Sequence, residues 1–399
     1  MKQIKYDIFL LVSILILACS CSKKLNINSF TPVSNGAIAS VDIDQDGKRD
    51  ILHMGYTGVF NQNGYNLISE VHLKRGKGKY HKIEDHPFPS LHYATITETD
   101  FNNDGFSELL INGYTNKHKS TTQLFYSDGK GNWRASNSSF IGLHLSSVGI
   151  LDIDKDGLLD IIMIGSNQDD VKTLVYRNLD GKNFKLENHS ITPVSTGALI
   201  VDDINGDGYE DIIINGYSHL KPFTEVYLNE KGNFVKQAYN LTGSYWGGAG
   251  LINSSKHKVL ILAGYNSTEK QIAEIYIFDK EKNEFNLIDS KDVSDNRHGY
   301  IITRDVNNDG NEDFFQFGQN SNKEINAALF VADDMGDFEK LPNQNFEGII
   351  SGFAEFLDFN GDGKLDIVYS GYNGDQISFY VYQNMNNVTF EQILHIKGN

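Results

Sequence analysis

The sequence predicts an all-β protein, a propeller of seven blades with four strands in each. Three observations support this fold class. A unit of about 50 residues recurs along the chain, each unit holds four short apolar or alternating runs, and Gly, Asn and Asp cluster between the runs. Strand-built repeats of this period are typical of a closed ring of blades. A continuous solenoid is the alternative, but four antiparallel strands per unit fit a blade better.

The four runs of a unit differ in composition. The first begins with small residues and leads into an acidic loop, as in Gly36-Ala37-Ile38. The second leaves that loop and ends in Gly, at Ile51–Gly55, Leu109–Gly113, Ile161–Gly165, Ile212–Gly216, Phe314–Gly318 and Ile367–Gly371. The third alternates, as in Glu225–Leu228. The fourth opens with an aromatic residue, namely Tyr80, Trp133, Phe184, Phe234, Phe285, Phe338 or Phe390.

The acidic loop recurs six times with oxygen-bearing side chains at its positions 1, 3, 5 and 9 and Gly at position 6. These side chains are Asp42, Asp44, Asp46, Asp50; Asp100, Asn102, Asp104, Glu108; Asp152, Asp154, Asp156, Asp160; Asp203, Asn205, Asp207, Asp211; Asp305, Asn307, Asp309, Asp313; Asp358, Asn360, Asp362 and Asp366. Ca²⁺ takes about six to eight oxygen ligands, and Gly permits the sharp turn. We therefore expect about six structural Ca²⁺ sites.

An EF-hand shares the first six positions of this loop, but it needs an acidic residue at position 12 and flanking helices. Position 12 here is never acidic, being His53, Ile111, Met163, Ile214, Gln316 or Tyr369. Each loop is therefore predicted to join two strands of a hairpin.

The fifth unit, residues 245–293, is degenerate. Its second strand ends at Gly264-Tyr265, as the fourth unit ends at Gly216-Tyr217, but the loop carboxylates are gone and Lys256 and Lys258 lie in the loop. We expect this unit to hold no calcium.

The formal net charge of −17 is concentrated in the six loops, which contain twenty carboxylates at the expected ligand positions. Nucleic-acid binding needs a basic patch, so nucleic acid is excluded as a partner. The sequence gives no signal for an oligomeric state.

The N-terminus is predicted to be a lipoprotein signal peptide, residues 1–18. Lys2 and Lys5 precede an apolar run too short to span a bilayer, and Ile-Leu-Ala-Cys19 resembles a bacterial lipobox. Cys21 is the alternative lipidation site, and residues 19–24 are the expected tether. Acyl chains on either cysteine would anchor the protein to the cell envelope, with the outer membrane the expected location. A soluble exported protein is the competing interpretation.

The loop pattern, the small residues before it and the Gly-ended strands after it resemble FG-GAP/VCBS-type repeats. Such repeats build the seven-bladed propeller of integrin α subunits and of many bacterial surface proteins. The resemblance spans roughly residues 25–396 and implies that loop positions 1, 3, 5 and 9 bind Ca²⁺. Glu108, one methylene longer than Asp, and the fifth unit depart from the pattern.

Two terminal segments compete for one place in the ring. The N-terminal stretch through Phe30 and the C-terminal Phe390–Ile396 both read as fourth strands. We expect the C-terminal copy to close the ring and the other to lie outside it.

The face opposite the acidic loops is the expected ligand surface. Tyr245, Trp246 and His298 are the candidate ligand patch, while the recurring Gly-Tyr pairs are expected to pack between blades. Common catalytic motifs are missing, so an enzyme is not expected. We expect a binding or adhesion module for a glycan or a protein. The alternatives are a structural component of an outer-membrane assembly and a propeller polysaccharide lyase.

Overall fold

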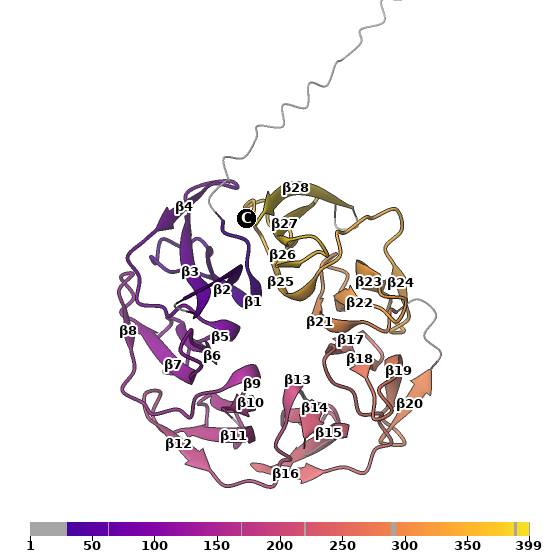
Figure 1. Ribbon diagram of the computed structural model, residues 1–399. Helices are drawn as coiled ribbons and strands as arrows, with labels where there is room; N and C mark the ends of the chain where they lie inside the picture. Colours follow the sequence, from indigo (N-terminus) through magenta and orange to yellow (C-terminus); the bar gives the residue numbers. More distant parts are fainter. Residues whose placement is uncertain are drawn as a thin grey trace, which may run out of the picture.

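A computed structural model describes residues 30–398, except residues 63, 169, 219–220, 289–292 and 387–388. These residues form seven antiparallel sheets of four consecutive strands, arranged as a ring (Figure 1), so the predicted propeller is confirmed. The expected signal peptide (1–18), the tether (19–24) with Cys19 and Cys21, and residues 25–29 of the expected propeller lie outside the described residues. The described part contains no helix with the length and apolar character needed to cross a membrane.

The first strand of each blade lies next to the central axis, and the second strand pairs with it (Figure 1). The first strands are β1 (Ser34–Val41), β5 (His92–Thr99), β9 (His144–Leu151), β13 (Ser195–Asp202), β17 (Ala249–Asn253), β21 (Arg297–Arg304) and β25 (Ile350–Leu357). The second strands are β2 (Asp50–Asn61), β6 (Glu108–Tyr114), β10 (Asp160–Asn167), β14 (Asp211–Ser218), β18 (Lys258–Tyr265), β22 (Asp313–Gln319) and β26 (Asp366–Tyr372).

The outer half of each blade holds the third and fourth strands. The third strands are β3 (Gly64–Lys74), β7 (Ser120–Ser127), β11 (Asp170–Asn178), β15 (Lys221–Glu230), β19 (Gln271–Asp279), β23 (Ile325–Ala332) and β27 (Ile377–Asn384). The fourth strands are β4 (Tyr80–Ile83), β8 (Trp133–Ala135), β12 (Phe184–Glu187), β16 (Asn233–Lys236), β20 (Glu284–Ile288), β24 (Phe338–Lys340) and β28 (Phe390–Lys397).

The second strands are mainly apolar because the central part of each is buried on both faces. In β14, Ile212 packs in the core shared with the preceding blade, and its neighbour Ile213 packs in the core shared with the following blade. Since successive strand residues point to opposite faces, one continuous apolar run serves two cores. The interfaces between blades are therefore the hydrophobic cores of this fold.

The C-terminal strand closes the ring, as expected, because β28 pairs with β27 in the last blade. The described part of the spare N-terminal segment does not lie outside, which corrects the expectation. Phe30 is buried between the first and last blades, 3.9 Å from the His72 ring and 5.0 Å from the Phe379 ring. Val33 exchanges hydrogen bonds with the Ser370 hydroxyl of the last blade. The apolar side chains of this segment fill the junction between the first and last blades, and the segment thereby stabilises the closed ring.

A buried polar cluster holds this segment on the first blade. The Glu70 carboxylate accepts hydrogen bonds from the Thr31 backbone N–H (3.1 Å) and hydroxyl (2.6 Å), and it lies 3.0 Å from Lys82 Nζ. His53 Nε2 contacts the Thr31 carbonyl at 3.2 Å, and His72 Nε2 lies 3.1 Å from Glu70. Burial lowers the pKa of His53 to about 4 and also lowers the pKa of His72. Both imidazoles are therefore neutral around an ionised carboxylate.

Candidate metal loops and channel mouth

The six acidic loops all join the first two strands of a blade and share one internal geometry. The position-1 carboxylate accepts the backbone N–H groups of positions 5 and 6; in the first loop these are Asp46 and Gly47, at 3.0 and 2.9 Å from Asp42. The same two bonds recur in the other five loops. The position-6 glycines have φ of +84° to +94°, a left-handed conformation that disfavours other residues.

The position-9 carboxylate lies under the loop and is almost completely buried. In the fourth loop, Asp211 accepts the N–H of Ile204 at 2.9 Å and the N–H of Asn229, at the end of the third strand, at 2.7 Å. Asp50, Asp160, Asp313 and Asp366 make the same pair of contacts. This carboxylate therefore fixes the hairpin tip to the third strand. Glu108 differs, because its second oxygen accepts from Asn102 Nδ2 at 2.9 Å.

Burial disfavours the ionised form of the position-9 carboxyl groups. It raises the pKa of Asp50 and Asp211 to about 6, and that of Glu108, Asp313 and Asp366 to about 7, with other loop carboxylates adding repulsion. Burial also raises the pKa of Asp160, although Arg177 opposes the shift. A bound cation would favour the ionised form, so the electrostatics of the loops suit a metal ion.

The oxygens at loop position 3 give a direct test of that fit. Asp44 Oδ1 and Asn360 Oδ1 are buried without a hydrogen-bond partner. In two loops three carboxylates bring one oxygen each within 4.8 Å of one another, namely Asp42, Asp44, Asp50 and Asp152, Asp154, Asp160. A buried oxygen without a donor needs a cation or water, and oxygen-only donors suit a hard cation. The residues present therefore fit Ca²⁺.

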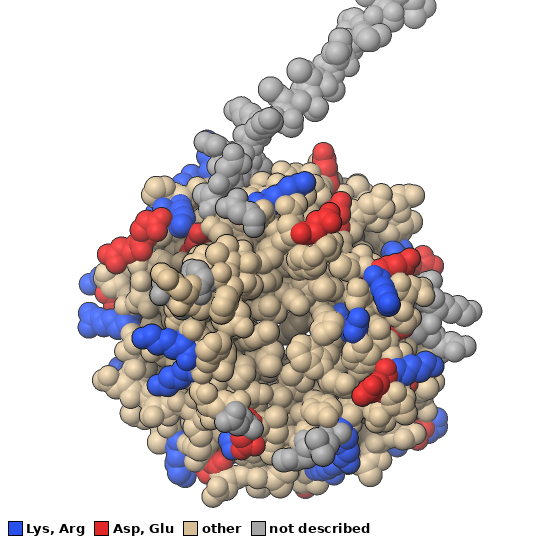
Figure 2. Space-filling view, viewed as in Figure 1, with Lys and Arg blue, Asp and Glu red and all other residues tan. Residues whose placement is uncertain are grey.

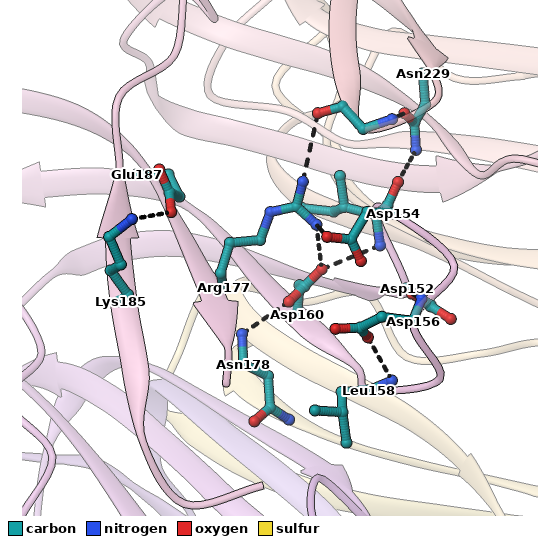
Figure 3. A network of polar contacts seen from close by, with 12 residues as sticks. Asp152, Asp154, Asp156, Leu158, Asp160, Arg177, Asn178, Lys185, Glu187 and Asn229 are labelled. Atoms are coloured by element: carbon teal, nitrogen blue, oxygen red, sulfur yellow. Dashed lines mark hydrogen bonds and ion pairs between the residues drawn. The ribbon is translucent and has the colours of Figure 1, made fainter. Parts of the chain in front are cut away.

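An arginine accompanies the aspartate at position 3 in both loops that have one there. Arg177 Nη1 lies 3.0 Å from Asp154 Oδ2 and 3.0 Å from Asp160 Oδ2 (Figure 3). Arg75 Nη2 lies 2.7 Å from Asp44 Oδ2. Position 3 of the other four loops is Asn. The two loops with Asp at position 3 have four carboxylates and one arginine, and the other four loops have three carboxylates. With every carboxylate ionised, the net charge at the ligand positions is therefore −3 in all six loops.

The fifth blade replaces the acidic loop with the shorter connection Asn253–Lys258. Val259 lies five residues before Gly264, as Asp211 lies five residues before Gly216 in the fourth blade. Val259 is therefore the equivalent of Asp211, and it is buried in the core. Lys258 pairs with Asp202 of the preceding blade and contacts Asn253 Oδ1 at 2.7 Å. The connection thus carries its own positive charge.

His53, Glu70 and His72 form a third group with ligand atoms within 4.8 Å, which the sequence analysis missed. The sequence contains a signal for this group, because His53 interrupts the apolar run that follows the first acidic loop. The structure places His53 opposite Glu70 in the pairing of β2 with β3. Lys82 and Thr31 already satisfy the Glu70 carboxylate. We therefore assign this group to ring closure.

The channel mouth on the opposite face is bordered by one residue at or just before the start of each first strand. All seven have left-handed backbone, with φ of +46° to +55°, and they are Asn35, Tyr93, Leu145, Thr196, Trp246, His298 and Ser351. This conformation costs about 1–2 kcal/mol in a non-glycine residue, so its recurrence reflects a geometric demand of every blade. All seven line one cavity of about 310 Å³. Figure 2 shows the hollow, with most charged side chains toward the outer edge.

Of the three residues in the candidate ligand patch, Trp246 and His298 lie at the channel mouth and Tyr245 does not. Trp246 is 40% exposed, and its ring packs against the His298 ring at 5.2 Å, so both belong to the channel mouth. Tyr245 instead bonds through its backbone to the backbone of Tyr265, and its ring packs against the Tyr217 ring, with the ring centres 4.9 Å apart. It is part of the packing between blades.

Three of the five tyrosines of the Gly-Tyr pairs contact the next blade, Tyr217 through Tyr245, whereas Tyr56 packs on Tyr65 of its own blade and Tyr372 is exposed. Tyr114 lies 4.3 Å from the His144 ring, and Tyr265 bonds to Arg297. His92 and His144 lie on either side of Tyr114, away from His298 at the mouth. The three histidines are therefore not gathered into one site.

Comparison with known proteins agrees with the repeat assignment. The model of the FG-GAP-like repeat matches residues 100–163 and 152–214, and each match contains two acidic loops. Among solved structures, that of YjhT matches 79% of this chain and 98% of its own, with 12% identity and a TM-score of 0.46. No curated protein matches the chain.

Proposed function

Because the chain carries FG-GAP-like repeats in a seven-bladed propeller, we propose that it is a binding module of the bacterial cell envelope. In this proposal Cys19 or Cys21 carries the lipid anchor at the outer membrane, Ca²⁺ in the six loops stabilises the ring, and the channel mouth binds a glycan. The propeller fold with these repeats supports the general role, and the site chemistry supports the ligand class.

One observation carries the glycan assignment: Trp246 is presented at the rim of a concave site whose lining is mostly uncharged and includes several hydroxyl groups. An indole offers an apolar face for a sugar ring and a polar N–H at its edge. Tyr93, Thr196 and Ser351 add hydroxyl groups around the same cavity. Its volume of about 310 Å³ lies at the lower end of small-ligand pockets, about 300–1,000 Å³.

The calcium assignment rests on the loops. When bound, Ca²⁺ would supply positive charge to the oxygens at positions 1, 3, 5 and 9, with Asp42, Asp44, Asp46 and Asp50 as the set in the first loop. It would accept the unpartnered oxygens of Asp44 and Asn360 as ligands. Its role in this proposal is structural, because the loops and the channel mouth lie on opposite faces.

A glycan array probed with the calcium-loaded protein, followed by titration calorimetry on the best ligand, tests the proposal. We expect Trp246→Ala to weaken binding at least tenfold and Tyr372→Ala to leave it unchanged. Tyr372 is a fair control because it is 38% exposed and does not line the cavity. Absence of any glycan ligand, or equal effects of the two variants, would refute a glycan site at the channel mouth.

The anchor is tested separately by metabolic labelling with a fatty acid in a bacterial host. Cys19→Ser is expected to abolish the label if Cys19 is the modified residue, and Cys21→Ser if it is Cys21. A wild-type protein that incorporates no label would contradict the lipoprotein assignment.

A further inference from the structure

Below the ring at the channel mouth, Tyr300 of β21 and Glu355 of β25 face the channel from adjacent blades. Both line the cavity that contains Trp246 and His298. Tyr300 is 46% exposed, although it belongs to an inner strand, because its ring projects into the channel. Glu355 also borders the larger cavity of about 820 Å³ at the other end of the channel. It therefore lies at the junction of the two cavities.

The charges lining the mouth cavity are of one sign. Its lining residues, as far as the structure describes them, include neither lysine nor arginine, and Glu355 is the acidic one. Burial lowers the pKa of His298, and Arg297 adds to the shift, so the imidazole is neutral at pH 7. An anionic ligand would find no counter-charge on this wall, whereas a cation would find one carboxylate.

Glu355 does have basic residues on its other side. Arg304 and Arg49 line the larger cavity, and Arg49 is paired with Glu98. Burial still raises the pKa of Glu355 to about 7, against the opposing fields of Arg304 and Arg49. A cation bound beside Glu355 would therefore favour the ionised form of this carboxyl.

We propose that the channel mouth binds an amino sugar with a free amine, its ring against Trp246 and its ammonium group between Glu355 and Tyr300. This inference rests on the proposed glycan function and narrows its ligand class. A carboxylate and a protonated amine form a charge-assisted hydrogen bond, about twice as strong as a neutral one. The Tyr300 ring adds a cation–π contact, worth about 0.5–2 kcal/mol depending on how far the ammonium is desolvated.

Titration of the calcium-loaded protein with two tetrasaccharides of equal length tests this inference. One is the β-1,4-linked glucosamine tetramer, and the other is its fully N-acetylated form. We expect the free-amine tetramer to bind at least tenfold more tightly. Glu355→Gln, which keeps the side-chain shape, is expected to remove that preference.

The outcomes separate the two proposals. Equal affinities for the two tetramers, or an unchanged preference in a Glu355→Gln protein with a wild-type melting curve, would overturn the amine site while leaving glycan binding intact. Failure of both tetramers and of every arrayed glycan would overturn the glycan function itself. A tetralysine peptide that binds as tightly, with the same loss in Glu355→Gln, would show that the site takes cationic peptides and would overturn the sugar assignment.

Discussion

Arg177 lies 3.0 Å, measured from Nη1 to Oδ2, from Asp154 at position 3 of the third acidic loop. The same nitrogen lies 3.0 Å from Asp160 at position 9, so one guanidinium joins two expected ligand positions. In the first loop Arg75 instead joins positions 3 and 5, through Asp44 and Asp46. Two carboxylates about 4 Å apart repel by about 1 kcal/mol in water and by more near a protein surface. The arginine offsets the additional carboxylate that distinguishes these two loops from the four with Asn.

Replacing Arg177 with Gln should therefore make the protein more dependent on calcium. Without the guanidinium, the third loop has a net charge of −4, so the metal-free form loses stability while Ca²⁺ restores it. We expect the melting temperature in excess EDTA to fall by several degrees and the fall in excess calcium to be less than half as large. Thermal denaturation followed by circular dichroism measures both values.

A double variant is the matched control. Arg177→Gln with Asp154→Asn reproduces the charge and residue pattern of the Asn-containing loops, and it should recover most of the loss seen in EDTA. If the single variant lost as much stability with calcium as without it, Arg177 would matter through packing or its contact with Gly232, and the charge argument would be wrong.

Removal of calcium from the native chain should lower its melting temperature by more than about 10 °C. A ligand that binds only the folded state stabilises it by about 2.7 kcal/mol per site at a hundredfold excess over Kd, and the chain has six such loops. Differential scanning calorimetry in calcium and in EDTA measures the change. Metal analysis of the dialysed protein should return about six calcium ions per chain. An unchanged transition in EDTA would contradict the structural role of the loops.

Shortening Glu108 to Asp should stabilise the second blade. Five loops use Asp at this position to accept an N–H from the end of the third strand, whereas Glu108 bonds to Asn102 inside its own loop. The equivalent donor in this blade is the N–H of Ser127. Glu108→Asp exchanges the contact with the partly buried Asn102 amide for one with the backbone, so we expect it to raise the free energy of unfolding by at most about 1 kcal/mol, the usual net value of one hydrogen bond. Urea denaturation checks this, and Asp366→Glu, the converse change, should be destabilising.

The sequence was sufficient for the architecture because the repeat recurs at the level of side-chain chemistry. Asp and Gly at fixed offsets mark every hairpin except the fifth, and an aromatic residue marks every fourth strand. Even the closing strand was predicted, since Phe390 follows the same rule as Phe338. These features are local, so they can be read without knowing which residues meet in space.

The set of residues at the channel mouth could not be predicted from a repeated sequence pattern. Its seven residues share a backbone conformation but no side-chain type, from Leu145 to Trp246, so no pattern connects them in the sequence. The pairing of Tyr300 with Glu355 depends on two strands of different blades, which lie side by side only after these blades have packed together. The burial of Phe30 has the same origin, because its partners belong to the first and last blades.

Acid should weaken the closure of the ring through His53, His72 and Glu70. The folded state holds the pKa of His53 at about 4, below its ordinary 6.5, and also lowers the pKa of His72 and Glu70. A group whose pKa is depressed by folding adds stability above its unfolded pKa and loses it as the pH falls toward the folded value. The two histidines should therefore cost stability between pH 6.5 and about 4, with His53 alone worth on the order of 3 kcal/mol.

Urea denaturation at several pH values in excess calcium measures this loss. The double variant His53→Gln with His72→Gln should have a lower free energy of unfolding at pH 7.5, because the buried contacts to Thr31 and Glu70 are altered, but a flatter dependence below pH 6.5. His81→Gln is the control, since His81 is exposed on β4 and should leave the pH profile unchanged. Protonation of the loop carboxylates affects all three proteins alike, so the difference between profiles isolates the buried histidines. A double variant that follows the wild-type profile through this range would show that the two imidazoles are not the acid-sensitive element of the closure.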